Sequence, residues 1–332
     1  MLRFDNRVAI ITGATHGLGR SYALLLGARG AKVIINCRKD NEFAQAAAAG
    51  VVSAGGEALV VAGDITDPST PKNLVSAAMD TWGRVDIAIS NAAVGGPQSR
   101  PFENNDETID SVFDLHVRAT LRLHQEAWPH MKRQQFGRLL TTGSAGGNGY
   151  IAFANGFDLD YPICKASLFG LVRQTAAEGK PHGILCNMIM PWAYTKMVAE
   201  AVGGSDLGVW MEANLRPDQV AAAVASLVHE DCPINGEAIT AGGGRVGRIF
   251  FAATRGIFDR DVTPELVTEQ WSQIIGTTAD DGTLLDAFEQ TQPREEAVHG
   301  AMLQEGKIPE LAVIAQMPLK GGSKSMKTEE SA

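Results

Sequence analysis

A tyrosine and a lysine stand four residues apart in the segment Tyr161-Pro162-Ile163-Cys164-Lys165. On a helix, side chains at this spacing are neighbours on one face. A phenol whose pKa is near 10 carries protons poorly at neutral pH, and a cation beside it favours the phenolate and lowers that pKa. The pair is therefore a candidate acid/base that moves a proton to or from a substrate oxygen. The alternative is an exposed tyrosine and lysine without a function.

A glycine-rich loop near the amino end is the second candidate site, with the sequence Thr12-Gly13-Ala14-Thr15-His16-Gly17-Leu18-Gly19. Glycine allows the positive φ of a tight turn and leaves room for a pyrophosphate where another residue has a Cβ. The N–H groups at the start of a following helix, expected over residues 20–28, favour an anion. The loop predicts a dinucleotide site, and a plain tight turn is the alternative.

Short apolar runs alternate with helical stretches and supply the elements that position both candidates. Seven runs have the length of strands: residues 7–12, 31–36, 58–62, 85–90, 138–142, 184–190 and 237–240. Helical stretches lie between them, including residues 43–54, 71–82 and 106–134. Several runs are apolar at consecutive positions, which is typical of strands covered on both faces. The pattern predicts an α/β fold, a doubly wound parallel seven-stranded sheet of the Rossmann type.

The alternation of strands and helices stops after Gly244. We predict a dinucleotide-binding and catalytic domain over residues 1–244 and a mainly helical C-terminal extension packed on it over residues 245–316. Residues 317–332 are predicted to form a disordered tail, because the last twelve contain no large apolar residue except Met326.

Composition excludes several classes of function. The 29 lysines and arginines against 38 aspartates and glutamates give a net charge of −9, which disfavours nucleic acid. The four cysteines have no metal-ligand or disulfide spacing, so neither a metal site nor a disulfide framework is expected. No stretch approaches the roughly 18 apolar residues of a membrane span. We expect a soluble protein in the cytoplasm, and the final Glu330-Ser331-Ala332 is not a peroxisomal address.

The spacing Gly-x3-Gly-x-Gly, together with Tyr-x3-Lys, resembles the short-chain dehydrogenase/reductase superfamily over roughly residues 3–244. The resemblance implies an NAD(P)-dependent oxidoreductase. It assigns Asp64 to the adenine ring, Asn91 and Ala92 to support of the cofactor, and Thr195 to the nicotinamide amide. Trp192 stands where the family has a glycine after Pro191. The predicted cofactor-binding residues are Gly13, Thr15, His16, Gly17, Leu18, Gly19, Arg38, Asp64, Ile65, Asn91, Ala92, Tyr161, Lys165, Pro191 and Thr195.

The same resemblance assigns the catalytic roles. Ser144, which lies 17 residues before Tyr161, would position the substrate oxygen, with a loop or helix-cap serine as the alternative. Lys165 would also hold the nicotinamide ribose. His116 takes the place of a family asparagine, and a packed histidine is the alternative. The long gap before Tyr161 implies an insertion in residues 147–160, next to the substrate pocket.

His116, residues 126–132 and residues 3–8 are similar to the D-3-hydroxyacyl-CoA dehydrogenase units of multifunctional β-oxidation enzymes. We therefore predict hydride transfer between nicotinamide and a small-molecule carbonyl or secondary alcohol, with a 3-hydroxyacyl-CoA type of substrate. A reductase of cyclic ketones or steroids and a non-catalytic cofactor-binding scaffold are the alternatives. The family also implies a homodimer or homotetramer.

Cofactor choice depends on the end of the second predicted strand. A carboxylate there binds the ribose 2′-hydroxyl of NAD and repels the 2′-phosphate of NADP. This chain has Cys37-Arg38-Lys39, with no carboxylate before Asp40, and His16 adds a basic side chain in the glycine loop. Arginine can donate two hydrogen bonds to a phosphate. We predict NADP rather than NAD, and a solvated turn is the alternative.

Overall fold

The computed structural model describes residues 1–93, 106–144, 160–251, 257 and 259–275. The chain divides into two compact units, Met1–Ile249 and Phe250–Ala332. The predicted boundary at residue 244 therefore lies five residues before the division that the contacts give.

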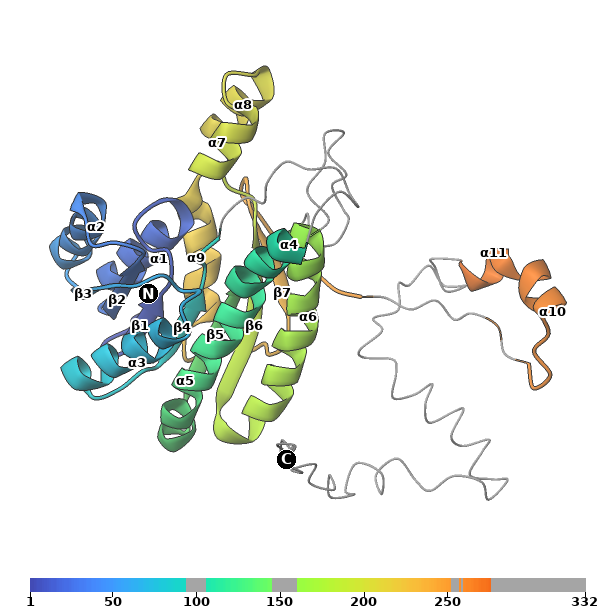
Figure 1. Cartoon of the computed structure of the whole chain (residues 1–332), viewed down its shortest axis with the longest axis horizontal. Coiled ribbons are helices and arrows are strands. Elements are labelled where there is room, and N and C mark those ends of the chain that lie inside the picture. Colours follow the sequence, from blue (N-terminus) through green and yellow to red (C-terminus); the bar gives the residue numbers. More distant parts are fainter. Residues whose placement is uncertain (94–105, 145–159, 252–256, 258, 276–332) are drawn as a thin grey trace, which may run out of the picture. The chain divides into compact units, whose positions relative to one another are not determined.

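A sheet of eight strands forms the centre of the first unit, in the order β3-β2-β1-β4-β5-β6-β7-β8 (Figure 1). Strands β1 to β7 are parallel, and β8 is antiparallel to β7. The strands are β1 (Val8–Ile11), β2 (Lys32–Cys37), β3 (Glu57–Ala62), β4 (Ile87–Ser90), β5 (Gly137–Thr142), β6 (Ile184–Pro191), β7 (Ala238–Gly242) and β8 (Arg245–Ile249). The predicted doubly wound α/β fold is confirmed, apart from the strand count.

Helices follow the strands along the first unit. They are α1 (Gly17–Ala28), α2 (Glu42–Ser53), α3 (Ser69–Trp82), α4 (Asp106–Phe113), the π-helical segment η1 (Asp114–Arg118), α5 (Ala119–Gln134), α6 (Asp160–Gly179), the 3₁₀ turn η3 (Lys180–His182), α7 (Lys196–Val202), α8 (Asp206–Asn214) and α9 (Pro217–Leu227). The long helix predicted over residues 106–134 is thus interrupted by a π-helical segment.

Two layers of helices cover the sheet, as the side chains of β1 show. Val8 and Ile10 belong to a buried cluster that includes residues of α3, α5 and α6. Ala9 and Ile11 belong to another buried cluster with residues of α1, α2 and α9. Because successive strand residues point to opposite faces, a strand buried on both faces must be apolar at every position. This explains why β1 has four consecutive apolar residues.

The eighth strand corrects the prediction of seven. Gly243 and Gly244 have φ angles of +59° and +79°, and two consecutive positive values are typical of the tight turns that join antiparallel strands. The chain therefore reverses, and Arg245 pairs with Gly242. Residues 245–249, which we assigned to the extension, belong to the sheet for this reason.

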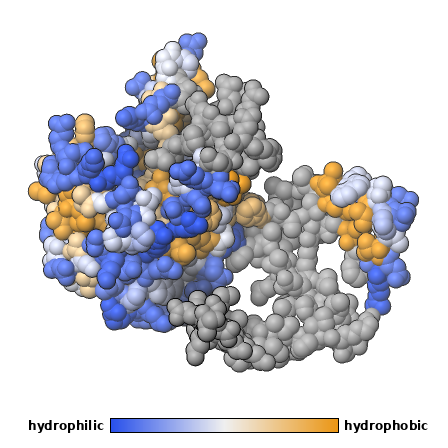
Figure 2. Space-filling model, in the orientation of Figure 1, coloured by the Kyte–Doolittle hydropathy of each residue, from blue (hydrophilic) through white to orange (hydrophobic). Residues whose placement is uncertain are grey.

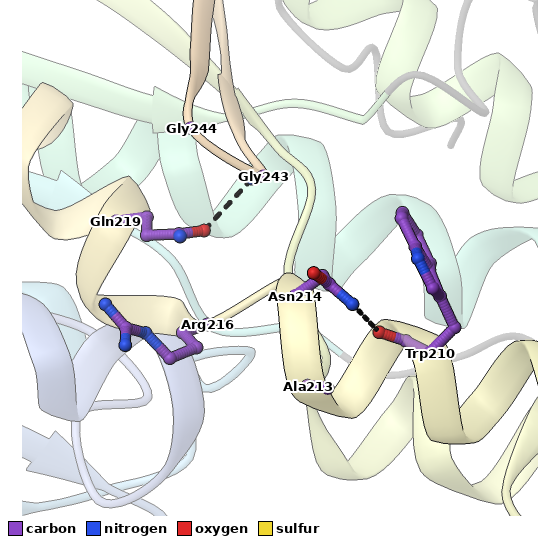
Figure 3. A pocket seen from close by; sticks show the side chains of 7 residues that line it. All are labelled: Trp210, Ala213, Asn214, Arg216, Gln219, Gly243 and Gly244. Atoms are coloured by element: carbon purple, nitrogen blue, oxygen red, sulfur yellow. Dashed lines mark hydrogen bonds between the residues drawn. The ribbon is translucent and has the colours of Figure 1, made fainter.

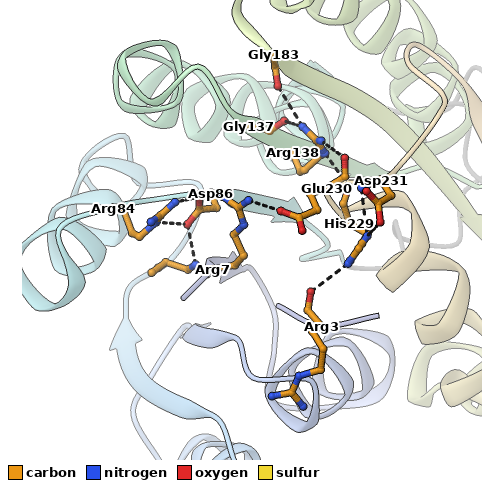
Figure 4. A network of polar contacts seen from close by, with 11 residues as sticks. Arg3, Arg7, Arg84, Asp86, Gly137, Arg138, Gly183, His229, Glu230 and Asp231 are labelled. Atoms are coloured by element: carbon orange, nitrogen blue, oxygen red, sulfur yellow. Dashed lines mark hydrogen bonds and ion pairs between the residues drawn. The ribbon is translucent and has the colours of Figure 1, made fainter. Parts of the chain in front are cut away.

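A buried carboxylate stabilises the edge of the sheet where the strands begin (Figure 4). Asp86, immediately before β4, is fully buried and accepts hydrogen bonds from Arg7 Nη1 at 3.1 Å and from the main-chain N–H of Val8 at 3.0 Å. Arg84 donates two more bonds to it, at 2.8 and 2.7 Å. A buried charge requires such partners, and these bonds join the starts of β1 and β4.

The described part of the second unit contains two short helices, α10 (Pro264–Glu269) and α11 (Trp271–Ile274). Neither helix has a buried residue. Figure 2 shows hydrophobic residues at the surface of this part. Val262, Trp271 and Ile275 are each more than half exposed. In the described residues of both units, no helix has the length and apolar character needed to cross a membrane.

Candidate active site

The predicted site residues follow the carboxyl ends of neighbouring strands. The glycine loop follows β1, Asn91 follows β4, Ser144 follows β5, and Thr195 follows β6. Since β1, β4, β5 and β6 are parallel neighbours, their carboxyl ends meet at one edge of the sheet. Ligands in open α/β sheets bind at this edge, where the strand order reverses, here between β1 and β4.

The glycine loop has the geometry of a pyrophosphate cradle. Gly13 and Gly17 have φ angles of +63° and +50°. A Cβ on Gly13 would lie 2.9 Å from the Cα of Ala92, and one on Gly19 would meet the carbonyl oxygen of Gly13. Helix α1 starts at Gly17 without a side-chain cap and without an acidic residue in its first turn. Its first N–H groups can therefore bind an anion, so the loop fits a dinucleotide cofactor.

Asn91 connects the glycine loop to β4. Its amide Nδ2 donates to the carbonyl oxygens of Thr12 at 3.0 Å and Gly13 at 3.3 Å. The hydroxyl of Thr12 accepts from the main-chain N–H groups of Asn91 at 2.9 Å and Ala92 at 3.0 Å. Asn91 therefore fixes the loop, and its support of the cofactor stays a prediction.

A small cavity adjoins these residues and contains two of the predicted cofactor-binding residues, Ile65 and Ala92. Leu115, from η1, also lines it and was missed in the sequence analysis because it belongs to no motif. Asp64 is exposed, and its Oδ1 accepts from the main-chain N–H and the hydroxyl of Thr66, at 3.0 and 2.8 Å. This carboxylate thus holds the turn that places Ile65.

The end of β2 brings a cation beside the glycine loop without a carboxylate at the last strand position. That position is Cys37, which is buried, and the next residue, Arg38, is exposed. Arg38 has no hydrogen-bond or ion-pair partner among the described residues. His16 Nδ1 lies 2.8 Å from the hydroxyl of Thr15, and its ring centroid lies 4.7 Å from that of Phe43 at the start of α2.

The four predicted catalytic residues lie together. Tyr161 is in the first turn of α6, where Pro162 is tolerated, and it shares a hydrogen bond with Ser144. Lys165 Nζ lies 5.6 Å from the centroid of the Tyr161 ring and donates to the carbonyl oxygen of Thr142 at 2.8 Å. The ring of His116 meets the Tyr161 ring edge-on, with centroids 5.3 Å apart. One cluster therefore holds the buried side chains of Tyr161, Lys165 and His116 together with the partly buried Ser144.

Burial dominates the electrostatics of this cluster. It raises the pKa of Tyr161, and the hydrogen bond with Ser144 offsets part of that increase. Burial also lowers the pKa of Lys165 to about 7, while the neighbouring thiol of Cys164 acts in the opposite direction. The lower pKa that we predicted for Tyr161 is not found, because burial rather than Lys165 is the largest influence on its hydroxyl.

His116 lies in the π-helical segment η1 and is almost fully buried. A π-helical turn inserts an extra residue into a helix and is common at functional sites. The carbonyl oxygen of His116 accepts a hydrogen bond from the hydroxyl of Thr120 at 2.9 Å. The ring of His116 in this segment faces Tyr161, an arrangement that helical periodicity in the sequence does not reveal.

Thr195 lies against the glycine loop, where it begins α7. A Cβ on Gly17 would lie 3.6 Å from Thr195 Cγ2, and the Thr195 side chain makes no capping hydrogen bond in α7. Pro191 ends β6, and Trp192 donates its main-chain N–H to the carbonyl oxygen of Ala241 at 2.8 Å. These contacts bring Pro191 and Thr195 to the same edge as the catalytic cluster. Most of the predicted insertion at residues 147–160 lies outside the described residues.

The profile of the family described as short chain dehydrogenase matches residues 7–203, which is more than half of the chain. The chain belongs to the short-chain dehydrogenase family. It is therefore an NAD(P)-dependent oxidoreductase, as predicted.

Individual relatives extend the match past the family profile. Peroxisomal multifunctional enzyme type 2 of Mus musculus is 36% identical over 286 residues, covering 82% of this chain and 37% of that protein. A short-chain type dehydrogenase/reductase of Mycobacterium tuberculosis is 31% identical over 282 residues, covering 81% of this chain and 94% of that protein. The second relative is thus little longer than the region that it shares with this chain.

The structure of full-length peroxisomal multifunctional enzyme type 2 from Drosophila melanogaster superimposes with a TM-score of 0.71 at 28% identity. The match covers 90% of this chain and 50% of that one. The chain thus spans half or less of the length of the mouse and fly enzymes. The predicted resemblance to the 3-hydroxyacyl-CoA dehydrogenase unit of such enzymes is confirmed.

Proposed function

We propose that this oxidoreductase prefers NADP(H) and interconverts a 3-oxoacyl thioester and the corresponding 3-hydroxyacyl thioester. The observation that carries the proposal is the cluster of Tyr161, Ser144, Lys165 and His116 beside a loop that fits a pyrophosphate. The similarity to peroxisomal multifunctional enzymes supports the thioester class.

Tyr161 is the proposed acid/base. When bound, the nicotinamide ring supplies a hydride to the carbonyl carbon in reduction, or accepts it in oxidation. Tyr161 donates its hydroxyl proton to the substrate oxygen in reduction and takes that proton back in oxidation. Because burial raises the pKa of Tyr161, the phenol is protonated and ready to donate. This state suits the reduction of a ketone.

Ser144 and Lys165 have supporting roles in this proposal. Ser144 shares a hydrogen bond with Tyr161 and would donate one to the same substrate oxygen. Lys165 is fixed by the carbonyl oxygen of Thr142 and would hold the nicotinamide ribose. Its pKa of about 7 leaves a substantial fraction protonated at neutral pH, and that cation would stabilise a phenolate at Tyr161. His116 would orient the Tyr161 ring through their edge-on contact.

The proposed preference for NADP rests on the residues at the end of β2. Arg38 is exposed there and has no partner among the described residues, so its guanidinium is available to a 2′-phosphate. The nearest acidic residue along the chain, Asp40, accepts a hydrogen bond from Gln45 Nε2 at 2.8 Å. His16, held by Thr15 and Phe43, adds a second basic group in the glycine loop.

Steady-state kinetics with NADPH and NADH test the function. We expect the full chain to oxidise NADPH with a 3-oxoacyl-CoA, and to reduce NADP with the D-3-hydroxyacyl-CoA in preference to the L form. Turnover only with a cyclic ketone or a steroid would show that the thioester class is wrong. Cofactor binding without turnover of any of these substrates would favour the non-catalytic scaffold.

Two further expectations stay predictions. The family resemblance implies a homodimer or homotetramer, and light scattering of the purified chain would give its mass in solution. The cytoplasmic location is a prediction from composition, which microscopy of the tagged chain in its own cells would test.

A further inference from the structure

A polar pocket of about 270 Å³ lies beside helix α8 and includes none of the residues proposed for catalysis or cofactor binding. Its lining comes from α8, the start of α9 and the turn between β7 and β8 (Figure 3): Trp210, Asn214, Arg216, Gln219, Gly243 and Gly244, with Ala213 between them. Sites that enclose a whole small ligand usually measure roughly 300–1,000 Å³. The pocket therefore suits one end of a longer molecule.

Hydrogen bonds hold two amide groups in this lining and leave one polar atom of each available. Asn214 donates from Nδ2 to the carbonyl oxygen of Trp210 at 2.8 Å, so its Oδ1 remains an acceptor. Gln219 accepts at Oε1 from the N–H of Gly243 at 3.0 Å, so its Nε2 remains a donor. The Trp210 side chain, 56% exposed, adds an aromatic surface on the α8 side. A heterocyclic base needs this combination of an aromatic face, a donor and an acceptor.

Arg216 supplies a positive charge to the same pocket. Its Nε and Nη2 pair with the two carboxylate oxygens of Asp218, both at 3.2 Å, and both side chains are more than half exposed. Exposed pairs of this kind contribute little to stability, and Nη1 takes no part in this one. The guanidinium can therefore bind a phosphate group. Since alanine is the only aliphatic side chain in the lining, a hydrocarbon tail would find few apolar contacts there and would bind weakly.

The main chain connects this pocket to the catalytic edge of the sheet. Leu215, between Asn214 and Arg216, accepts a hydrogen bond at its carbonyl oxygen from the N–H of Tyr194 at 2.6 Å. Tyr194 directly precedes Thr195, which contacts the glycine loop. Strand β7, which leads into the turn at the pocket, is two positions from β5, which leads to Ser144. Two strand spacings are about 10 Å, a span that the pantetheine arm of coenzyme A exceeds.

We propose that this pocket binds the adenosine phosphate end of an acyl-CoA substrate, while the acyl end reaches Tyr161. Trp210 stacks on the adenine, the two amides bond to its edge, and Arg216 pairs with a phosphate. The inference rests on the proposed thioester activity and identifies the part of the chain that distinguishes CoA thioesters from shorter thioesters.

Two thioesters of the same 3-oxoacyl group test this inference, one with CoA and one with N-acetylcysteamine, which lacks the nucleotide. At saturating NADPH, we expect Trp210→Ala to raise KM for the CoA thioester about tenfold, since loss of one stacked base contact usually weakens binding by roughly 5- to 150-fold. KM for the short thioester should not change. Trp210→Phe keeps an aromatic face and should restore most of the affinity. Val209→Ala, which removes an exposed side chain from the same helix outside the pocket, is the matched control.

Adenosine 3′,5′-bisphosphate provides an independent probe. At saturating NADPH it should compete with the CoA thioester, leave turnover of the short thioester unchanged, and lose this effect in Trp210→Ala. If the wild-type enzyme turns over both thioesters with the same KM and the bisphosphate does not compete, the pocket assignment is wrong and the proposed function stands. If neither thioester is turned over, the proposed function is wrong, and the pocket assignment fails with it.

Discussion

Cofactor preference can be reversed at the end of β2 if Arg38 binds the 2′-phosphate of NADP. The perturbation is the double substitution Cys37→Asp with Arg38→Leu. Cys37 is the last residue of β2, and its thiol already lies close enough to Asp40 for that carboxylate to raise its pKa, although burial is the larger cause. A carboxylate at position 37 would accept from the ribose 2′-hydroxyl of NAD and repel a 2′-phosphate.

The size of the effect follows from the contact that is removed. Arg38 is exposed and has no partner among the described residues, so a bond to phosphate replaces only bonds to water. A hydrogen bond to a charged group contributes about 1.5–3 kcal/mol, and 1.4 kcal/mol corresponds to a tenfold change in affinity. We therefore expect the wild-type chain to bind NADPH at least about tenfold more tightly than NADH. Arg38→Leu alone should remove this difference, and the double substitution should reverse it.

Fluorescence titration of NADPH and NADH at one fixed ionic strength measures these affinities. Lys39→Leu is the matched control, because it removes a neighbouring exposed cation and leaves the Arg38 guanidinium in place. If Lys39→Leu weakens NADPH binding as much as Arg38→Leu does, the preference comes from the overall positive charge of the turn and not from a specific contact of Arg38 with the phosphate. Equal affinity of the wild-type chain for both cofactors would refute the reasoning altogether.

Two further predictions concern stability. Asp86→Asn should lower the free energy of unfolding by about 1.5–3 kcal/mol, because it removes the charge that accepts part-buried hydrogen bonds from two arginines. Urea denaturation measures this loss, and the exposed Asp5 paired with Arg3 supplies the control Asp5→Asn, for which we expect little change. Without cofactor, stability should fall as pH decreases from about 10.5 to about 7, because the unfolded chain protonates Lys165 over a range in which the folded chain does not. Lys165→Met should remove this contribution. The Tm of the variant minus the Tm of the wild-type chain should therefore decrease as pH rises through that range, and a constant value would contradict the prediction.

The sequence was sufficient for the parts of the fold that depend on local patterns. Runs such as Val8–Ile11 are apolar at every position because both faces of the strand are covered. A glycine-rich loop between a strand and a helix has few structural explanations other than a dinucleotide site. Strand β8 was missed because its pairing depends on the turn at Gly243 and Gly244, and apolar periodicity carries no information on that turn.

The site was predictable where a motif carries it. The spacing of Tyr161 and Lys165 makes them candidates, the family resemblance adds Ser144, and the structure brings the three together. The π-helical segment at His116 was missed, since one extra residue in a helix hardly changes the pattern of apolar residues. The effect of burial on Tyr161 was missed as well, because it depends on residues from several elements. The pocket at Trp210 was missed for a related reason: three separate segments form it, and none has a motif of its own.

Turnover by Tyr161→Phe tests the central claim most directly. The substitution keeps the ring that packs edge-on against His116 and removes only the hydroxyl that would move the proton. A positioned acid or base typically contributes about 10²–10⁴-fold. We therefore predict that kcat for the NADPH-dependent reduction of a 3-oxoacyl-CoA falls by at least about a hundredfold, while the Kd for NADPH stays nearly the same. Retention of more than about a hundredth of the wild-type kcat would contradict the assignment of Tyr161 as the acid/base.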